Sequence, residues 1–373
     1  MIYFDNAATG GFKPRAVFDA AENVMRYLSA NPGRSGHRLS VAGANIVYEC
    51  RRLAADIFGS NPERVIFTKN CTEALNTAIF GTLNRGGHVI TTVYEHNSVL
   101  RPLYSLQKKG LISFDTADDS EIDIVRAIED RIRPETYLIV INAVSNVTGK
   151  ILPIDKIGAL AKKHNLLFIV DGAQAGGHIP VNVEKSNITA LALAGHKGLY
   201  GIMGSGLLIL SETADVTPLC YGGTGSESFS LSQPEYYPER LESGTLNLPA
   251  IAALSEGLRY LKNNMKNFAD AVYGHTSRLI EGLSGISRVK CFSEPNPAGI
   301  VSFWIEGIES SDASDILSSE YDIGVRGGLH CAPLVHKKLG TSPEGLIRAS
   351  LAVQNSSREI DFFIRAVKNI CSK

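Results

Sequence analysis

The 373-residue chain carries 37 basic and 38 acidic side chains, so its formal net charge is −1 and no basic stripe indicates a nucleic-acid partner. No run approaches the roughly 20 apolar residues of a membrane span, and the N-terminus lacks the features of a signal peptide. The six cysteines show neither CxxC spacing nor a compact His/Cys cluster, which argues against zinc and favours free thiols. We therefore expect a cytoplasmic protein of about two domains that binds neither membrane nor nucleic acid.

Short apolar runs alternate with helical patterns through the first two thirds of the chain. The predicted strands cover residues 64–68, 88–92, 137–141, 167–170, 188–193 and 206–210. The helices predicted among them cover residues 72–80, 121–131 and 154–164. Such alternation is typical of an α/β fold with a mostly parallel sheet and helices on both faces. Ligands of these sheets bind beyond the carboxyl ends of the strands, so the residues found there are the candidates for a site.

The pattern changes after about residue 250, where a smaller C-terminal α+β domain is predicted. Its elements are helices over 249–278 and 358–371 and strands over 300–305 and 323–326. Before it, residues 221–243 are rich in Gly, Ser, Pro and Glu and are predicted to form a long loop, a feature that is often functional. We expect three parts: an N-terminal segment, 1–15, that packs with the small domain, a large domain, 16–250, and the small domain, 251–373.

Lys197 lies between two predicted strands and is flanked by Gly195 and Gly198, so it belongs to a strand end and not to a solvated helix face. Asp171 directly follows another apolar strand, and Gln174 comes soon after it. Pyridoxal 5′-phosphate (PLP) needs an amine that bonds covalently to its aldehyde and a carboxylate that pairs with its pyridinium nitrogen. These residues predict a PLP site, although Asp171 could also serve as a helix cap or a turn residue.

Four further residues follow predicted strands. Thr72 is expected to cap a helix whose free N–H groups suit a phosphate, or to cap an ordinary helix. His96 could stack on a cofactor ring or be structural. Asn146 could donate to the phenolic oxygen of the cofactor or to a substrate carboxylate, or be a turn residue. His196, beside the lysine, could bind phosphate.

Cys331 lies in a Gly-rich turn that ends in proline, a poor place for a core cysteine. Arg326, His330 and His336 are near it in sequence, and cationic neighbours favour a reactive thiolate. Arg348 is a lone cation in an apolar run, so it needs an anion. A substrate carboxylate would provide a bidentate partner, and a structural salt bridge is the alternative.

Together these runs resemble the class V aminotransferase superfamily of fold-type I PLP enzymes, and within it the cysteine desulfurases. The resemblance spans nearly the whole chain. The run that begins at Arg326 is similar to the RxGHHCxxP signature of the group II, SufS-like branch, which also contains selenocysteine lyases. The other matching runs are residues 3–9, 31–37, 171–174, 195–197, 242–245 and the run around Arg348.

The resemblance implies a role for each of these residues. Lys197, Cys331 and His96 would be catalytic, with Cys331 as the sulfur acceptor. Asn146, Arg326 and Arg348 would bind the substrate. The cofactor-binding residues would be Cys71, Thr72, His96, Asn146, Asp171, Gln174, His196, Lys197 and Thr245, of which Thr245 would reach the phosphate from the partner subunit of a homodimer.

Three positions depart from the branch: Ala194 replaces a serine, Leu329 replaces the first histidine of the signature, and Asn70-Cys71 replaces a Gly-Thr-like pair. The expected reaction converts L-cysteine to L-alanine and leaves a persulfide on Cys331 for an acceptor protein or thiol, in iron–sulfur cluster assembly or another thio-cofactor pathway. Three alternatives stay open: a selenocysteine lyase, another class V reaction such as transamination, and a sulfur-relay scaffold whose main task is partner binding.

Overall fold

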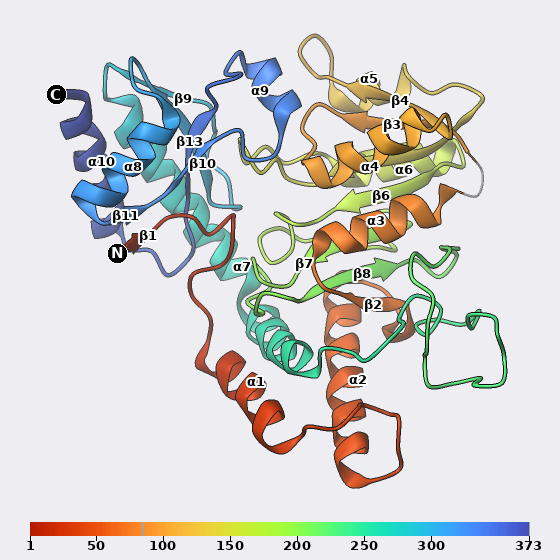
Figure 1. The fold of residues 1–373 in the computed structure, drawn as a ribbon. Coiled ribbons are helices and arrows are strands. Elements are labelled where there is room, and N and C mark those ends of the chain that lie inside the picture. Colours follow the sequence, from red (N-terminus) through yellow and green to blue (C-terminus); the bar gives the residue numbers. More distant parts are fainter. Residues whose placement is uncertain (84–85, 373) are drawn as a thin grey trace.

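The computed structural model describes residues 1–83 and 86–372, and a seven-stranded sheet runs through its larger part (Figure 1). The sheet pairs are parallel except for the two that β8 makes. The strand order is β2 (Val65–Thr68), β8 (Gly206–Leu210), β7 (Ala190–Ala194), β6 (Leu167–Asp171), β5 (Thr136–Asn142), β3 (Gly87–Thr92) and β4 (Ile112–Ala117). The predicted mostly parallel sheet is therefore confirmed.

Successive residues of the central strands enter opposite cores, as the pleat requires. In β5, Ile139 and Ile141 belong to one core and Leu138 and Val140 to the other. The second core is covered by α3 (Cys71–Gly81) and α4 (Asn97–Lys108). The first core is covered by α2 (Arg38–Phe58), α5 (Ile124–Glu129), α6 (Ile154–Lys163) and the first half of α7 (Leu248–Ser284), so helices cover both faces, as predicted.

The long helix α7 links the two parts of the molecule, because Leu254 and Leu258 lie in the large core and Leu279 and Leu283 in a separate C-terminal core. The C-terminal core is built on an antiparallel sheet, packed by α8 (Ser310–Tyr321) and α10 (Ser357–Ser372). The strand order of that sheet is β12 (Arg326–Gly328), β13 (Leu346–Ser350), β10 (Ile300–Ile305) and β9 (Val289–Cys291). Between β12 and β13 lies α9 (Pro333–Leu339).

The chain start lies beside this C-terminal part, where β1 (Ile2–Tyr3) pairs with β11 (Ile323–Gly324) (Figure 1). The strand predicted over 323–326 is therefore wrong as one element, because β11 and β12 join different sheets. The helix predicted over 121–131 is shorter, since the Asp123 carboxylate accepts the Val125 N–H and starts α5 at Ile124. The sequence analysis also missed α2, α4, α8, α9 and α1 (Arg15–Tyr27).

The predicted loop is confirmed: residues 221–243 form no helix or strand. Among the described residues, no helix has both the length and the apolar character that crossing a membrane requires. The same residues contain no His/Cys/Asp/Glu group suited to a metal ion. All six cysteines are free thiols.

Candidate active site

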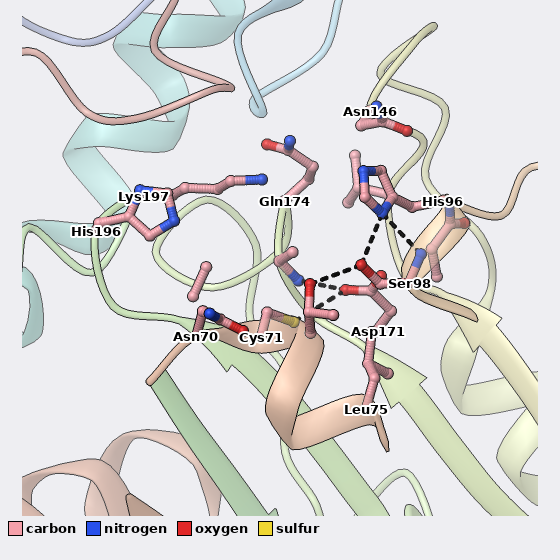
Figure 2. A pocket seen from close by; sticks show the side chains of 15 residues that line it. Asn70, Cys71, Leu75, His96, Ser98, Asn146, Asp171, Gln174, His196 and Lys197 are labelled. Carbon is pink, nitrogen blue, oxygen red and sulfur yellow. Dashed lines mark hydrogen bonds between the residues drawn. The ribbon is translucent and has the colours of Figure 1, made fainter. Parts of the chain in front are cut away.

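A pocket opens at the carboxyl ends of β5, β6 and β7, where the first turn of α3 closes one side (Figure 2). Parallel strands end at the same edge of the sheet, so side chains far apart in sequence meet there. Eight of the predicted residues line this pocket: Cys71, Thr72, His96, Asn146, Asp171, Gln174, His196 and Lys197. The remaining predicted residues, Thr245, Arg326, Cys331 and Arg348, lie outside its lining.

The Lys197 side chain extends across the pocket toward Gln174 (Figure 2). Burial lowers the pKa of the Lys197 amine, an effect that Cys71 and Asp171 partly oppose. A lowered pKa raises the fraction of neutral amine near pH 7, and neutral amine is the form that acts as nucleophile or base. The Gln174 amide donates to the carbonyl of Ala7 over 3.0 Å, so it ties the N-terminal segment to the pocket wall.

Asp171 ends β6 and is 4 % exposed. Its Oδ1 accepts the Ala173 N–H over 2.9 Å and lies 3.4 Å from the Cys71 thiol. Burial and the neighbouring carboxylate raise the pKa of Cys71, so this thiol stays protonated and donates to Asp171. Cys71 is thus a side-chain partner of the acid and also lines the pocket in which it was expected to bind the cofactor.

The start of α3 differs from the prediction that Thr72 is its cap. Asn70 is the N-cap, and its side chain accepts the Glu73 N–H over 2.9 Å. Thr72 is instead a first-turn residue, and its hydroxyl oxygen lies 2.8 Å from that of Ser98. The first N–H groups of the helix have no intrahelical partner and face the pocket side of the sheet, which suits an anion.

His96 is the N-cap of α4, and its Nδ1 accepts the Ser98 N–H over 3.0 Å. Burial lowers its pKa, so the ring is neutral and the proton sits on Nε2. The Ser98 hydroxyl lies 3.0 Å from the same Nδ1, and so links the imidazole to Thr72. The sequence analysis missed Ser98, because its role depends on His96 being the cap of α4.

His196 lines the opposite side of the pocket, and its Nδ1 lies 3.1 Å from the Thr9 hydroxyl. Burial, with help from the nearby charges of Lys197 and Lys13, lowers the pKa of His196 to about 4. In the absence of a bound anion this ring is therefore a neutral hydrogen-bonding group.

Glu95 precedes His96 in sequence and is fully buried. Its Oε1 accepts the Thr92 hydroxyl over 2.6 Å, and its Oε2 has no partner. Burial raises the pKa of Glu95 to about 8. The folded protein therefore holds a proton that the unfolded chain loses above its ordinary pKa of 4.5.

Glu95→Gln is expected to be more favourable for stability at pH 8 than at pH 5, when the variant is compared with wild type at each pH. The folded state binds more protons than the unfolded state between about pH 4.5 and pH 8, so wild-type stability falls as pH rises through that window. Glutamine removes this dependence, and the difference in unfolding free energy between variant and wild type should grow by about 3 kcal/mol from pH 5 to pH 8. Urea unfolding of both proteins at pH 5 and pH 8 measures this difference. If it is the same at the two pH values, Glu95 does not have a raised pKa in the folded protein.

Cys331 lies in the turn between β12 and α9, exposed beside the pocket. Its carbonyl accepts the Asn97 N–H over 2.7 Å, and the His330 carbonyl accepts the Asn146 amide over 2.8 Å. These two bonds dock the turn onto the segments that carry His96 and Asn146. The structure thereby brings the turn that carries Cys331, from the C-terminal part of the chain, next to two segments that line the pocket.

Of the three cationic neighbours expected for Cys331, Arg326 supplies charge: its Nη2 lies 4.0 Å from the thiol sulfur. The expectation is wrong for the two histidines. His330 is 2 % exposed and lies 3.0 Å from the Leu346 carbonyl, and His336 is buried against Thr341. Burial lowers the pKa of both rings, so they are neutral.

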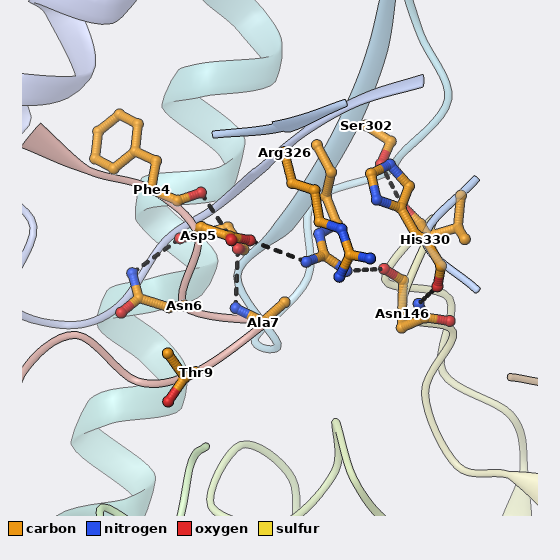
Figure 3. Close-up of polar contacts among 12 residues, drawn as sticks. Phe4, Asp5, Asn6, Ala7, Thr9, Asn146, Ser302, Arg326 and His330 are labelled. Atoms are coloured by element: carbon orange, nitrogen blue, oxygen red, sulfur yellow. Dashed lines mark hydrogen bonds and ion pairs between the residues drawn. The ribbon is translucent and has the colours of Figure 1, made fainter. Parts of the chain in front are cut away.

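Arg348 has structural partners in Asp5 and Asn146, both of which are labelled in Figure 3. Its side chain is 1 % exposed, and its Nη2 lies 3.0 Å from Asp5 Oδ1 in the N-terminal segment. Its Nη1 donates to the Asn146 carbonyl over 3.0 Å, whereas Nε has no partner. The salt bridge weighed as an alternative is therefore present. The sequence analysis missed Asp5, whose position in the N-terminal run was the available signal.

Thr245 is exposed, outside the pocket, at the end of the loop over 221–243. Its hydroxyl accepts the Asn31 amide over 3.4 Å. Both residues belong to runs that carry the family resemblance, and the structure places these runs side by side.

A mostly parallel sheet whose strand ends present an amine, a carboxylate and an imidazole to one pocket defines an aminotransferase-like α/β enzyme. The chain belongs to the aminotransferase class-V family, whose model matches residues 2–363. Enzymes of this family generally use PLP.

Full-length relatives and solved structures show which enzymes of this family the chain is similar to. A probable cysteine desulfurase of Pyrococcus abyssi is 34 % identical over 390 residues, which cover 99 % of this chain and 94 % of that protein. The structure of a cysteine desulfurase from Thermococcus onnurineus superposes with a TM-score of 0.93 at 34 % identity, covering 100 % of this chain and 94 % of the other. A cysteine desulfurase from Escherichia coli shares the fold, with a TM-score of 0.90 at 24 % identity over 99 % and 94 % of the two chains.

Proposed function

We propose that this protein is a PLP-dependent cysteine desulfurase that converts L-cysteine to L-alanine and carries the released sulfur as a persulfide on Cys331. The observation that carries the proposal is the docking of the Cys331 turn at a pocket that contains Lys197 and Asp171. A transaminase needs the lysine and the acid but has no use for a thiol beside them. The names of the full-length relatives support the same reaction.

The pocket residues fit PLP. Lys197 offers an amine of lowered pKa, and Asp171 a buried carboxylate for a ring nitrogen. The start of α3 offers N–H groups to a phosphate. Asn142 and Asn146 each have a buried amide oxygen without a partner, so two hydrogen-bond acceptors in the pocket are available to a ligand. PLP would supply an electron sink for the bonds at the substrate carbon.

Each residue then has a task. Lys197 would hold the cofactor and, once the substrate amine replaces it, take the proton from the substrate Cα. Asp171 would keep a proton on the ring nitrogen. The neutral His96 would stack against the ring and keep its Nε2–H free to donate. Asn146 and Arg348 would hold the substrate carboxylate, in which case Arg348 would share its charge with Asp5.

Cys331 would take the sulfur. Cys331 Sγ would bond to the substrate sulfur as the Cβ–S bond breaks. The electron pair of that bond stays with Cβ, which takes up a proton and becomes the methyl group of alanine. The substrate is thereby reduced and the thiol is oxidised to a persulfide, so no external oxidant is needed. Arg326, whose Nη2 lies 4.0 Å from Sγ, would place a positive charge beside the attacking sulfur.

The proposal includes a homodimer in which Thr245 reaches the partner's phosphate, since Thr245 lies outside the pocket of its own chain. Residues 16–250 would form the cofactor-binding domain and residues 251–373 the domain that carries Cys331 and Arg348. The persulfide would pass to an acceptor protein or thiol.

The test is incubation of the purified protein with L-cysteine, with alanine assayed and the persulfide mapped by mass spectrometry. Wild type is expected to carry the extra sulfur on Cys331. Cys331→Ser should carry none and form alanine about 100-fold more slowly, because the nucleophile is gone. Cys220→Ser, at another exposed thiol, should behave as wild type.

Alanine formation that survives Cys331→Ser unchanged would contradict the proposal and favour another class V reaction. Selenide release from selenocysteine that far exceeds sulfur release, and that persists in Cys331→Ser, would identify a selenocysteine lyase. If neither wild type nor Cys331→Ser binds PLP, the protein would be a sulfur-relay scaffold.

A further inference from the structure

The helix that follows Cys331 is tied to the large sheet by a cluster of charged side chains. Lys338 lies in the last turn of α9, and its side chain is only 15 % exposed. Its Nζ pairs with Asp118, lies 3.0 Å from Asp119 Oδ1 and lies 2.7 Å from the Ser120 hydroxyl. These three acceptors follow β4 directly, so one ammonium joins the C-terminal part of the chain to the edge of the large sheet.

The cluster extends inward through Asp119, whose side chain is 10 % exposed. Asp119 also pairs with Lys150 and accepts the Tyr94 hydroxyl over 2.7 Å. The two ammonium groups lie near the Tyr94 ring, with Lys150 Nζ 5.1 Å and Lys338 Nζ 5.7 Å from its centroid, within range of cation–π attraction. Ion pairs that share partners in a network in this way outweigh isolated surface pairs.

Two members of the cluster belong to segments that touch the Cys331 turn. Tyr94 precedes His96 and Asn97, and the Asn97 N–H bonds to the Cys331 carbonyl. Lys150 follows Asn146, whose amide bonds to the His330 carbonyl. The cluster therefore ties α9 to the same two segments onto which the thiol turn is docked.

The thiol turn itself is strained. His330 and Cys331 have φ angles of +48° and +58°, a left-handed conformation that is unfavourable for residues with a Cβ. Such strain persists only where the surroundings over-determine the backbone. One side of the turn is held by the buried His330 ring on Leu346, and the other side continues into α9. The backbone on this second side stays in place only if α9 itself is anchored.

We propose that Lys338 is a positioning residue: by pairing with Asp118 and Asp119 it holds α9 against the large sheet and keeps the Cys331 thiol at the mouth of the pocket. This inference rests on the proposed role of Cys331 as sulfur acceptor. Lys338 touches neither the thiol nor the pocket lining and acts through the helix.

The test compares Lys338→Met with Lys338→Arg and with Lys337→Met, an exposed neighbour on the same helix. The first readout is the rate at which iodoacetamide alkylates Cys331 in the resting protein, followed by mass spectrometry. We expect Lys338→Met to raise this rate at least 3-fold, because the thiol, which is already exposed, is then no longer held in one position beside Arg326 and meets the reagent in more orientations. Lys338→Arg should restore the rate to within 2-fold of wild type. Lys337→Met should match wild type.

The second readout is the rate of alanine formation. Lys338→Met should lower kcat at least 10-fold and leave KM for L-cysteine within 2-fold, because the substrate pocket is intact. Asp118→Asn should reproduce the kcat loss in part, and Lys338→Met/Asp118→Asn should be no slower than Lys338→Met, since both variants remove one interaction. If Lys338→Met fails to fold, Asp118→Asn tests the same interaction from the other partner.

Unchanged alkylation and unchanged kcat in Lys338→Met, or equal effects in Lys337→Met, would overturn the inference. A loss of kcat without any change in alkylation would do so too, since the thiol would not have moved. If wild type itself forms no alanine from L-cysteine, the proposed function fails, and the alkylation rates still decide whether Lys338 positions the turn.

Discussion

Lys197→Ala is expected to lower alanine formation by about 10³-fold or more. The variant loses both the covalent anchor of PLP and the amine that takes the substrate proton, and proton transfer by a positioned side chain contributes about 10²–10⁴-fold on its own. The amine is suited to this task because burial lowers its pKa. The variant should still fold, since the alanine removes a buried amine that forms no ion pair within the described residues.

A second measurement separates anchoring from activity. Borohydride reduction of wild type loaded with PLP should add the mass of the reduced cofactor to the peptide that contains Lys197, and Lys197→Ala should gain none. Lys197→Arg is the matched control for charge: its guanidinium stays protonated and does not attack an aldehyde, so it should be as inactive as the alanine variant. Cofactor attached to another lysine in wild type would refute the assignment.

Glu242→Ala is expected to lower the free energy of unfolding by about 3 kcal/mol or more, because it leaves a buried cation without a partner. Arg51 and Glu242 pair over 2.5 Å with side chains 8 % and 7 % exposed. Glu242 also accepts the Phe67 N–H over 2.7 Å, and Arg51 donates to the Val65 carbonyl. The pair thus joins α2, the edge strand β2 and the segment that ends at Thr245.

Urea unfolding followed by circular dichroism measures this loss. Arg51→Met/Glu242→Leu should recover much of it, since apolar residues of similar size replace a buried pair at little cost. Glu49→Gln is the control on the same helix: it removes a partly exposed partner of Arg52 and Arg259 and should change stability little. If Glu242→Ala were as mild as Glu49→Gln, the pair would not be buried in solution. Weaker PLP binding in Glu242→Ala would support the role of Thr245.

Much of the sheet was predictable because its strands are buried on both faces and appear as continuous apolar runs. The runs around Ile139 and Ile169 are examples, and both lie in the central strands. The amphipathic helix α2 was missed although its pattern is regular, since small residues such as Gly43 and Ala44 blur its apolar face. Short strands such as β11 depend on a partner from the chain start, which no local pattern reveals.

The pocket residues were predictable for a related reason. Lys197, Asp171 and His96 each follow an apolar strand, and parallel topology brings such ends together. Ser98 and Asn97 escaped notice because their roles depend on the start of α4, where His96 is the cap.

The sequence by itself determined the fold class and the amine and acid of the pocket, because strand periodicity and strand-end residues are local properties of the chain. It also indicated a reactive loop thiol, whose role as sulfur acceptor the family resemblance implied. The tertiary structure alone decided which partners the charged side chains have. Arg348 meets Asp5, 343 residues away, and Lys338 meets Asp118 across the edge of the sheet. Such pairs form only when packing brings distant segments within a few ångströms and excludes water, and no spacing along the chain encodes that distance.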